Sequence, residues 1–160
     1  MFMLYLLGFI WTLPISIITW IIMGLAELSL EIEKVTVNKN GIFVWDLKNT
    51  GFLYRKVFIK RGFWGFSSGN NVIVVDTDFK RYGRTIKHET KHCFQQYALG
   101  IFYFPVYLLI YLYTYLFGGK DKHPYYDHPF EKSARKAAGQ IVNIPRKEWS
   151  QGPVDRNIFW

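Results

Sequence analysis

Cysteine is almost absent from this 160-residue chain, because Cys93 is the only one. A single cysteine excludes an internal disulfide and a metal site built from several cysteine thiolates. The chain also has no recognisable nucleic-acid-binding motif, so we expect no nucleic-acid partner. The net charge of +8 comes from lysines and arginines that are scattered between apolar segments rather than gathered on one helix. Such a charge favours an anionic membrane surface, and we expect membrane lipid to be a partner.

Charged side chains are missing altogether from two long segments, residues 1–26 and 97–117. Each segment is long enough to cross a bilayer as a helix. For the first segment, the alternative is a signal peptide cleaved near the small residues at 24–26, but it has no basic start and its apolar run is too long. We therefore predict a transmembrane anchor over residues 1–26. Residues 27–96 contain twelve lysines and arginines, which predicts that this region lies on the cytoplasmic side.

Between the two apolar segments the sequence changes to short runs rich in β-branched and aromatic residues, separated by turn residues. Asn40-Gly41 predicts a hairpin with a type I′ turn. The expected strands cover residues 35–37, 42–47, 52–59 and 72–75. Together with helices expected over residues 85–96 and 129–142, these runs predict an α+β protein with a small antiparallel sheet and an N-terminal membrane helix.

One motif in the second half of the chain carries specific chemistry, His88-Glu89-Thr90-Lys91-His92. Residues four apart lie on the same face of a helix, so both imidazoles can bind one metal ion. Glu89 is then placed to take a proton from a water molecule bound to that ion. We predict a Zn2+ site with His88 and His92 as ligands and Glu89 as the general base.

A catalytic zinc site needs a third protein ligand. The metzincin pattern would place a histidine six residues after His92, but that residue is Ala98, so this class is excluded. The best candidate is Glu131, which falls in the first turn of a helix that begins at Pro129. Taken alone, it would be an ordinary first-turn glutamate favoured by the helix dipole. Beside the two histidines, we predict that Glu131 is the third metal ligand.

These residues resemble the gluzincin group of zinc metallopeptidases, which use two helix histidines and a downstream glutamate. The chain is more narrowly similar to small predicted metallopeptidase-like proteins that carry HExxHxxQ, Leu-Gly, YYDNPFE and Ala-rich motifs. The resemblance covers residues 66–142. The matching residues are His88, Glu89, His92, Gln95, Leu99-Gly100, Tyr125-Tyr126-Asp127-His128-Pro129-Phe130-Glu131 and Ala134.

The resemblance implies a minimal zincin-like fold in which residues 69–75 form the edge strand beside the cleft. Residues 72–75 could then pair with an extended peptide, although an ordinary buried strand has the same pattern. Two residues depart from the family patterns. His128 stands where Asn is usual, and Arg135 stands where an Asp often orients a ligand histidine. Asp127 is our candidate for that orienting role.

The activity implied is peptide-bond hydrolysis, in which zinc polarises the scissile carbonyl and Glu89 transfers a proton to the leaving amine. The substrate would be a peptide or protein of unknown sequence. His123, Tyr125, Tyr126 and His128 could each donate a hydrogen bond to the oxyanion. Tyr126 and His128 are our candidate catalytic residues beside Glu89.

The expected ligands also constrain the path of residues 97–117. His92 precedes this segment and Glu131 follows it, so a single crossing would leave the ligands on opposite sides of the membrane. We therefore predict a re-entrant or interfacial segment that bends near residues 100–105. The chain divides into an anchor (residues 1–26), a zincin-like metallopeptidase domain (residues 27–144) and an irregular tail (residues 145–160).

The sequence therefore predicts a membrane-associated zinc metallopeptidase with its catalytic region on the cytoplasmic side. The alternative is a non-enzymatic membrane or assembly protein that keeps a structural or degenerate zinc site.

Overall fold

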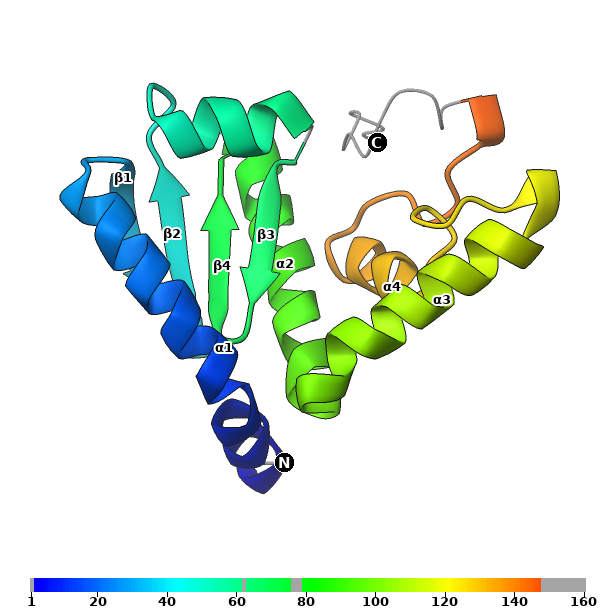
Figure 1. The fold of residues 1–160 in the computed structure, drawn as a ribbon, viewed down its shortest axis with the longest axis horizontal. Coiled ribbons are helices and arrows are strands. Elements are labelled where there is room, and N and C mark those ends of the chain that lie inside the picture. The colour runs from blue at the N-terminus through cyan, green and yellow to red at the C-terminus, as the bar shows by residue number, and fades with distance from the viewer. Residues whose placement is uncertain (1, 62, 76–78, 148–160) are drawn as a thin grey trace.

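The fold is α+β, as the sequence predicts, with helices on both faces of a small sheet (Figure 1). The computed structural model describes residues 2–61, 63–75 and 79–147, so most of the expected irregular tail lies outside the described residues. The elements are α1 (Phe2–Leu28), β1 (Ile32–Val37), β2 (Phe43–Leu47), η1 (Leu53–Phe58), η2 (Ile59–Arg61), β3 (Gly65–Ser68), β4 (Asn71–Val74), α2 (Phe79–Leu99), η3 (Gly100–Phe102), α3 (Tyr103–Phe117), η4 (Gly119–Asp121) and α4 (Pro129–Ala137).

The sheet has four strands in the order β1-β2-β4-β3. The β1–β2 and β3–β4 pairs are antiparallel, whereas β2 and β4 are parallel. The prediction of an entirely antiparallel sheet is therefore wrong. β4 lies in the interior of the sheet and β3 forms the edge, which also corrects the expectation that residues 69–75 form the edge strand. Residues 72–74 already pair on both sides, so β4 has no free edge for an added peptide strand.

The segment expected as a strand at residues 52–59 is helical instead. Its start is stabilised by Glu31, whose two carboxylate oxygens accept hydrogen bonds from the backbone N–H groups of Phe52 and Leu53 at 2.9 and 3.0 Å. Unpaired N–H groups at a helix start are satisfied well by a carboxylate. Because Glu31 lies 21 residues before Phe52, the local sequence pattern gave no sign of this contact.

The hairpin at Asn40-Gly41 is present, but its turn is not type I′. That turn type requires positive φ at both central residues. Gly41 has φ +72°, whereas Leu30 is the one non-glycine residue with positive φ in the described chain. The Asn38 side-chain oxygen accepts hydrogen bonds from the N–H groups of Asn40 and Ile42. This side-chain contact stabilises a longer loop with a left-handed glycine near its end.

Alternate side chains of the central strands pack on opposite faces of the sheet, as strand geometry requires. Val44, Val72 and Val74 face α2 and surround the buried Cys93. The opposite face packs against α1 in a cluster of eight buried residues: Met23, Ala26, Ile32, Trp45, Leu47, Phe58, Ile73 and Val75. Figure 1 shows α1 in front of the sheet and α2 behind it. The first apolar segment is therefore part of the domain core.

α2 is separated from α3 by the short helix η3, which begins at Gly100. Gly100 has φ +55° and lies against α1, where an added Cβ atom would come within 1.2 Å of Trp11 Nε1. Both the backbone conformation and the contact therefore require glycine. This bend turns α3 away from the axis of α2, in the range that the sequence predicts.

Replacing Gly100 with alanine is expected to lower the free energy of unfolding by about 2 kcal/mol or more, from a strained φ and the displaced Trp11. Gly24→Ala is the matched control, because nothing lies within 4 Å of the added Cβ atom. Denaturant unfolding in detergent measures both variants. Equal stability of Gly100→Ala and the parent would show that α1 and η3 do not pack as described.

Two helical stretches are long and apolar enough to cross a membrane, judged by length and composition alone. They are Leu6–Leu28 within α1 and Arg81–Phe117, which runs from α2 to α3.

Candidate metal centre

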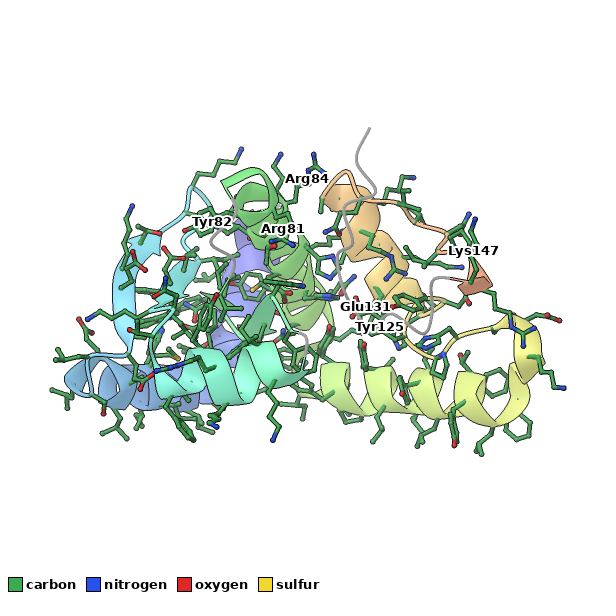
Figure 2. The ribbon with its side chains drawn as sticks, turned by 90° about the horizontal axis from the view of Figure 1, so that it is seen from above. Arg81, Tyr82, Arg84, Tyr125, Glu131 and Lys147 are labelled. Atoms are coloured by element: carbon green, nitrogen blue, oxygen red, sulfur yellow. The ribbon has the colours of Figure 1, made fainter. Side chains whose placement is uncertain are left out.

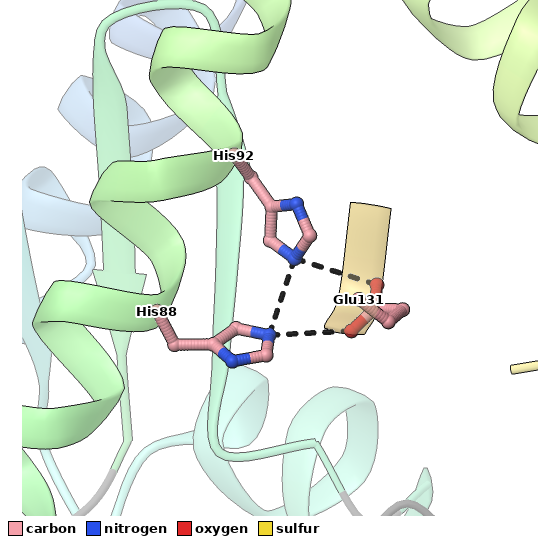
Figure 3. Close-up of side chains that lie close together, drawn as sticks. All are labelled: His88, His92 and Glu131. Carbon is pink, nitrogen blue, oxygen red and sulfur yellow. Dashed lines mark hydrogen bonds and ion pairs between the residues drawn. The ribbon is translucent and has the colours of Figure 1, made fainter. Parts of the chain in front are cut away.

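Three buried side chains converge on one point between α2 and α4 (Figure 3). The Nε2 atoms of His88 and His92 are 3.1 Å apart. Glu131 Oε2 lies 3.3 Å from His88 Nε2, and Glu131 Oε1 lies 3.4 Å from His92 Nε2. Donor atoms about 2.0–2.1 Å from a tetrahedral zinc ion would be about 3.3 Å from one another. The three separations therefore match the spacing of ligands around one metal ion.

The two helices place these side chains for local reasons. His88 and His92 are four residues apart in α2, so their imidazoles project from one face. In α4, Pro129 occupies the first turn and His128 caps the helix, accepting a hydrogen bond from Phe130 N–H through Nδ1. Glu131 follows within the first turn, where the helix dipole favours a carboxylate.

Both candidate ligand histidines contact a glutamine through the other ring nitrogen. His88 Nδ1 lies 2.9 Å from Gln140 Oε1, and His92 Nδ1 lies 2.7 Å from Gln95 Oε1. The amide of Gln95 also donates to the Phe130 carbonyl at 3.1 Å, which fixes its oxygen toward His92. An amide oxygen only accepts, so an Nδ1 atom that donates to it carries the ring proton and leaves Nε2 as the nitrogen able to bind a metal ion.

Gln140 reaches His88 because of the way α4 ends. Gly139 has φ +69°, and Gln140 N–H donates to the Arg135 carbonyl at 2.9 Å. This is the Schellman arrangement, in which a left-handed glycine reverses the chain after the last turn. The reversal brings the next side chain back over α2. The glycine that ends the ligand helix therefore also positions the partner of His88.

Glu131 is buried, yet its surroundings favour the charged form of its carboxyl group. Burial alone would raise the pKa of its carboxyl group, but hydrogen bonds and charge from His88 and His92, when their Nε2 atoms carry protons in place of an ion, hold this pKa well below the usual range. Tyr107 donates a hydrogen bond to Glu131 Oε1 at 3.0 Å. Within the described chain, the buried Oε2 atom accepts no hydrogen bond. A buried carboxylate that lies beside two imidazole nitrogens and has one oxygen without a hydrogen bond fits a metal ligand.

Glu89 lies under the edge strand β3, next to the ligand histidines in α2. A Cβ atom at Gly65 would come within 3.1 Å of Glu89 Oε1 and 2.7 Å of the Thr85 methyl group, so glycine allows this close approach. Burial raises the pKa of Glu89, while the nearby His88 lowers it to a smaller extent. A carboxylate with a raised pKa is a better proton acceptor. This position suits the general base that the sequence predicts.

The candidate oxyanion donors differ in their burial and in their hydrogen-bond partners. Both ring nitrogens of His128 are engaged, since Nε2 donates to the Tyr107 carbonyl at 3.1 Å and Nδ1 accepts from Phe130 N–H. His128 is fully buried and its ring stacks on Tyr107, so its visible role is to join α3 to α4. Tyr126 is also buried, and its ring packs against His123. Both rings are buried, and the catalytic role of Tyr126 and His128 stays a prediction.

Tyr125 is better placed than either of them. It is partly exposed, and Figure 2 shows it beside Glu131. Burial, and then the charge of Glu131, raise the pKa of the Tyr125 hydroxyl well above its usual value. The hydroxyl therefore keeps its proton and can donate a hydrogen bond within electrostatic range of Glu131.

Asp127 does not contact the ligand histidines in the way the sequence analysis expects. Its carboxylate lies 2.7 Å from Lys132 Nζ and accepts a hydrogen bond from His123 N–H at 2.9 Å. These contacts hold the loop before α4. The orienting role belongs instead to Gln140 and Gln95, which act on His88 and His92.

Two tyrosines of the second apolar segment also belong to the site, and the sequence analysis missed them. Tyr107 bonds Glu131, and the Tyr103 hydroxyl lies 3.1 Å from His92 Nδ1. Their spacing of four residues places both on one face of α3. Tyrosines repeated every four residues in an otherwise apolar run (Tyr103, Tyr107 and Tyr111) were the available signal.

Replacing Tyr107 with phenylalanine is expected to weaken zinc binding by about 10-fold to 100-fold, because Glu131 loses the hydroxyl that holds its ligand oxygen. Tyr113→Phe is the control, since Tyr113 lies on the same helix and is exposed. Competition with a zinc-chelating dye gives both affinities. Equal affinities of the two variants would mean that the hydroxyl does not support the ligand.

Comparison of this chain with protein-family models, with curated proteins and with solved structures gives no match. The functional argument therefore depends on the geometry of His88, His92 and Glu131, which could together hold a metal ion.

Proposed function

We propose that this chain is a membrane-associated zinc metallopeptidase of the gluzincin type. The observation that carries the proposal is the convergence of two imidazole nitrogens and the Glu131 carboxylate at the spacing of tetrahedral ligands. A second buried carboxylate, that of Glu89, lies in α2 beside the two histidines. Two histidines and one glutamate are a donor set that zinc prefers, and they leave a fourth position free. When bound, zinc would polarise the scissile carbonyl group and lower the pKa of a water molecule.

The residues around the proposed ion have separate tasks. Glu89 would accept the proton of the attacking water and pass it to the leaving amine. Tyr125 would donate a hydrogen bond to the developing oxyanion, which makes it our replacement for Tyr126 and His128 in that role. Gln140 and Gln95 would hold His88 and His92 in the tautomer whose Nε2 atom can bind the ion.

The membrane part of the proposal draws on the exposed apolar helices and on the basic charge of residues 27–96, which favours the cytoplasmic side. The competing function is a non-enzymatic membrane or assembly protein with a structural zinc site. That function predicts bound zinc without peptide cleavage.

Cleavage of a complex peptide mixture separates the two functions. The zinc-loaded protein in detergent is incubated with peptides from a digested proteome, and new termini are counted by mass spectrometry. We expect new termini that disappear with 1,10-phenanthroline and return when zinc is added back. Stoichiometric zinc without new termini would contradict the peptidase and favour the non-enzymatic function.

A further inference from the structure

The outward face of α1 is more hydrophobic than the face that packs against the protein. The packed stripe contains small or hydroxyl-bearing residues such as Thr12, Ser16 and Thr19, which are buried. The outward face carries aliphatic side chains such as Ile18 and Leu25, which are 57% and 60% exposed. Helices on water-soluble domains have the opposite arrangement. Small and polar residues at helix contacts, with aliphatic residues outside, are typical of helices in lipid.

α3 has the same arrangement. Its packed face includes Tyr103 and Tyr107, which bond the metal ligands. Its other face carries Leu108, Leu109 and Leu116, which are more than half exposed. A lipid environment explains both helices in the same way.

α1 is fastened to the domain along most of its length. Ser16 accepts a hydrogen bond from Asn70 N–H at 3.0 Å, and Thr19 donates to Ser68 at 2.8 Å. Nearer the N-terminus, a Cβ atom at Gly8 would come within 2.5 Å of Tyr97 Cβ, so α1 also lies close to the end of α2. If α1 crossed a bilayer, these contacts would pull the sheet into the hydrocarbon.

The sheet is not suited to that position. It is open, and its edge strand β1 carries the exposed charges of Glu33 and Lys34. Open sheet edges do not occur against lipid, because their backbone groups would lose hydrogen bonds. A crossing by α1 alone is therefore incompatible with the contacts that hold α1 to the sheet.

We propose that α1 and α3 lie along the surface of one membrane leaflet, with their outward aliphatic faces in lipid, and that α1 does not cross the bilayer. In Figure 2 the C-terminal part of α1 and α3 lie along the same edge of the molecule, which agrees with a shared side. This placement replaces the transmembrane anchor that the sequence predicts for residues 1–26.

Lipid fits this surface better than a second copy of the chain. The net charge of +8 would make two copies repel each other, whereas anionic headgroups would attract it. Lys120 and Lys122 follow α3 directly, where they can reach headgroups from the end of an interfacial helix. The placement is independent of the peptidase proposal, because it depends on α1 and the outward face of α3 rather than on the metal ligands.

Depth measurements with lipid quenchers test the proposal. Single cysteines at Leu7, Ile18, Leu25 and Leu109, in a Cys93→Ala background, are labelled with an environment-sensitive fluorophore. The full chain is placed in vesicles of phosphatidylcholine and phosphatidylglycerol that carry a quencher either near the headgroup or near the acyl-chain end. Leu7 and Leu25 are about 27 Å apart along a helix, nearly the thickness of the hydrocarbon core.

We expect all four positions to be quenched more strongly by the shallow quencher, and to equal depth along α1. A label at Thr50, an exposed polar loop residue, is the control and should not be quenched. Deep quenching at Ile18 with shallow quenching at Leu7 and Leu25 would overturn the proposal in favour of a crossing helix. Absence of quenching at all four positions would overturn it in favour of another occupant, and cross-linking would then identify a second copy. Circular dichroism establishes that each labelled variant is folded.

Discussion

Replacing Glu89 with glutamine is expected to lower the rate of peptide cleavage by about a hundredfold to ten-thousandfold, while the protein keeps its zinc. The amide has nearly the shape of the carboxylate but cannot accept a proton from water. Glu89 is not one of the three converging ligands, so the metal affinity should change little. Cleavage rate and zinc content are measured on the same preparation.

Glu33→Gln is the matched control, because Glu33 is an exposed glutamate on β1, away from the ligand helices. It should retain both activity and zinc. Undiminished cleavage by Glu89→Gln would show that the activity comes from a contaminant or from different chemistry. Loss of zinc in Glu89→Gln would instead place Glu89 among the ligands.

Replacing Glu131 with alanine is expected to weaken zinc binding by about two to three orders of magnitude. The binding free energy of a protein zinc site is spread over three or four ligands, and two histidines alone form an incomplete set. The change also leaves the Nε2 atoms of His88 and His92 facing each other without the carboxylate. Competition against a chelator of known affinity measures the loss.

Glu89→Gln serves as the control for this second prediction, since it removes one buried carboxylate from the same site without removing a ligand. Its affinity should stay within a few-fold of the parent. If Glu131→Ala binds zinc as tightly as the parent, the third ligand is another residue and the proposed site is wrong.

The parts of the site that the sequence predicted are those determined by spacing within one helix. His88 and His92 lie on one face because four residues make about one turn, and Pro129 starts the helix that carries Glu131. The contact between α2 and α4 could be predicted only with the additional premise that one metal ion binds three protein ligands. The close approach of His88, His92 and Glu131 agrees with that premise.

The parts that the sequence did not predict depend on contacts between distant residues. Glu31 stabilises a helix where the β-rich composition favoured a strand. Gln140 reaches His88 only because Gly139 reverses the chain after α4. The parallel pairing of β2 with β4 likewise depends on how the intervening helix packs, which a local pattern does not contain.

The composition of the two apolar segments did not predict which face of each helix packs against the protein. Length and hydropathy describe α1 and α3 as possible membrane spans, yet one face of each helix is used by the protein. Ser16 and Thr19 contact the β3–β4 turn, and Tyr107 donates a hydrogen bond to Glu131. Which face packs and which is exposed depends on the tertiary structure, so the sequence alone favoured a simple anchor.

X-ray absorption at the zinc edge, on protein loaded with one equivalent of zinc, tests the central claim most directly. We predict a four-coordinate zinc with two imidazole nitrogens at about 2.0–2.1 Å and oxygen in the remaining positions. The imidazole signal should fall to one ring in a His92→Ala variant. A shell of oxygen alone, or an unchanged imidazole signal in that variant, would contradict the assignment of His88, His92 and Glu131 as the ligands.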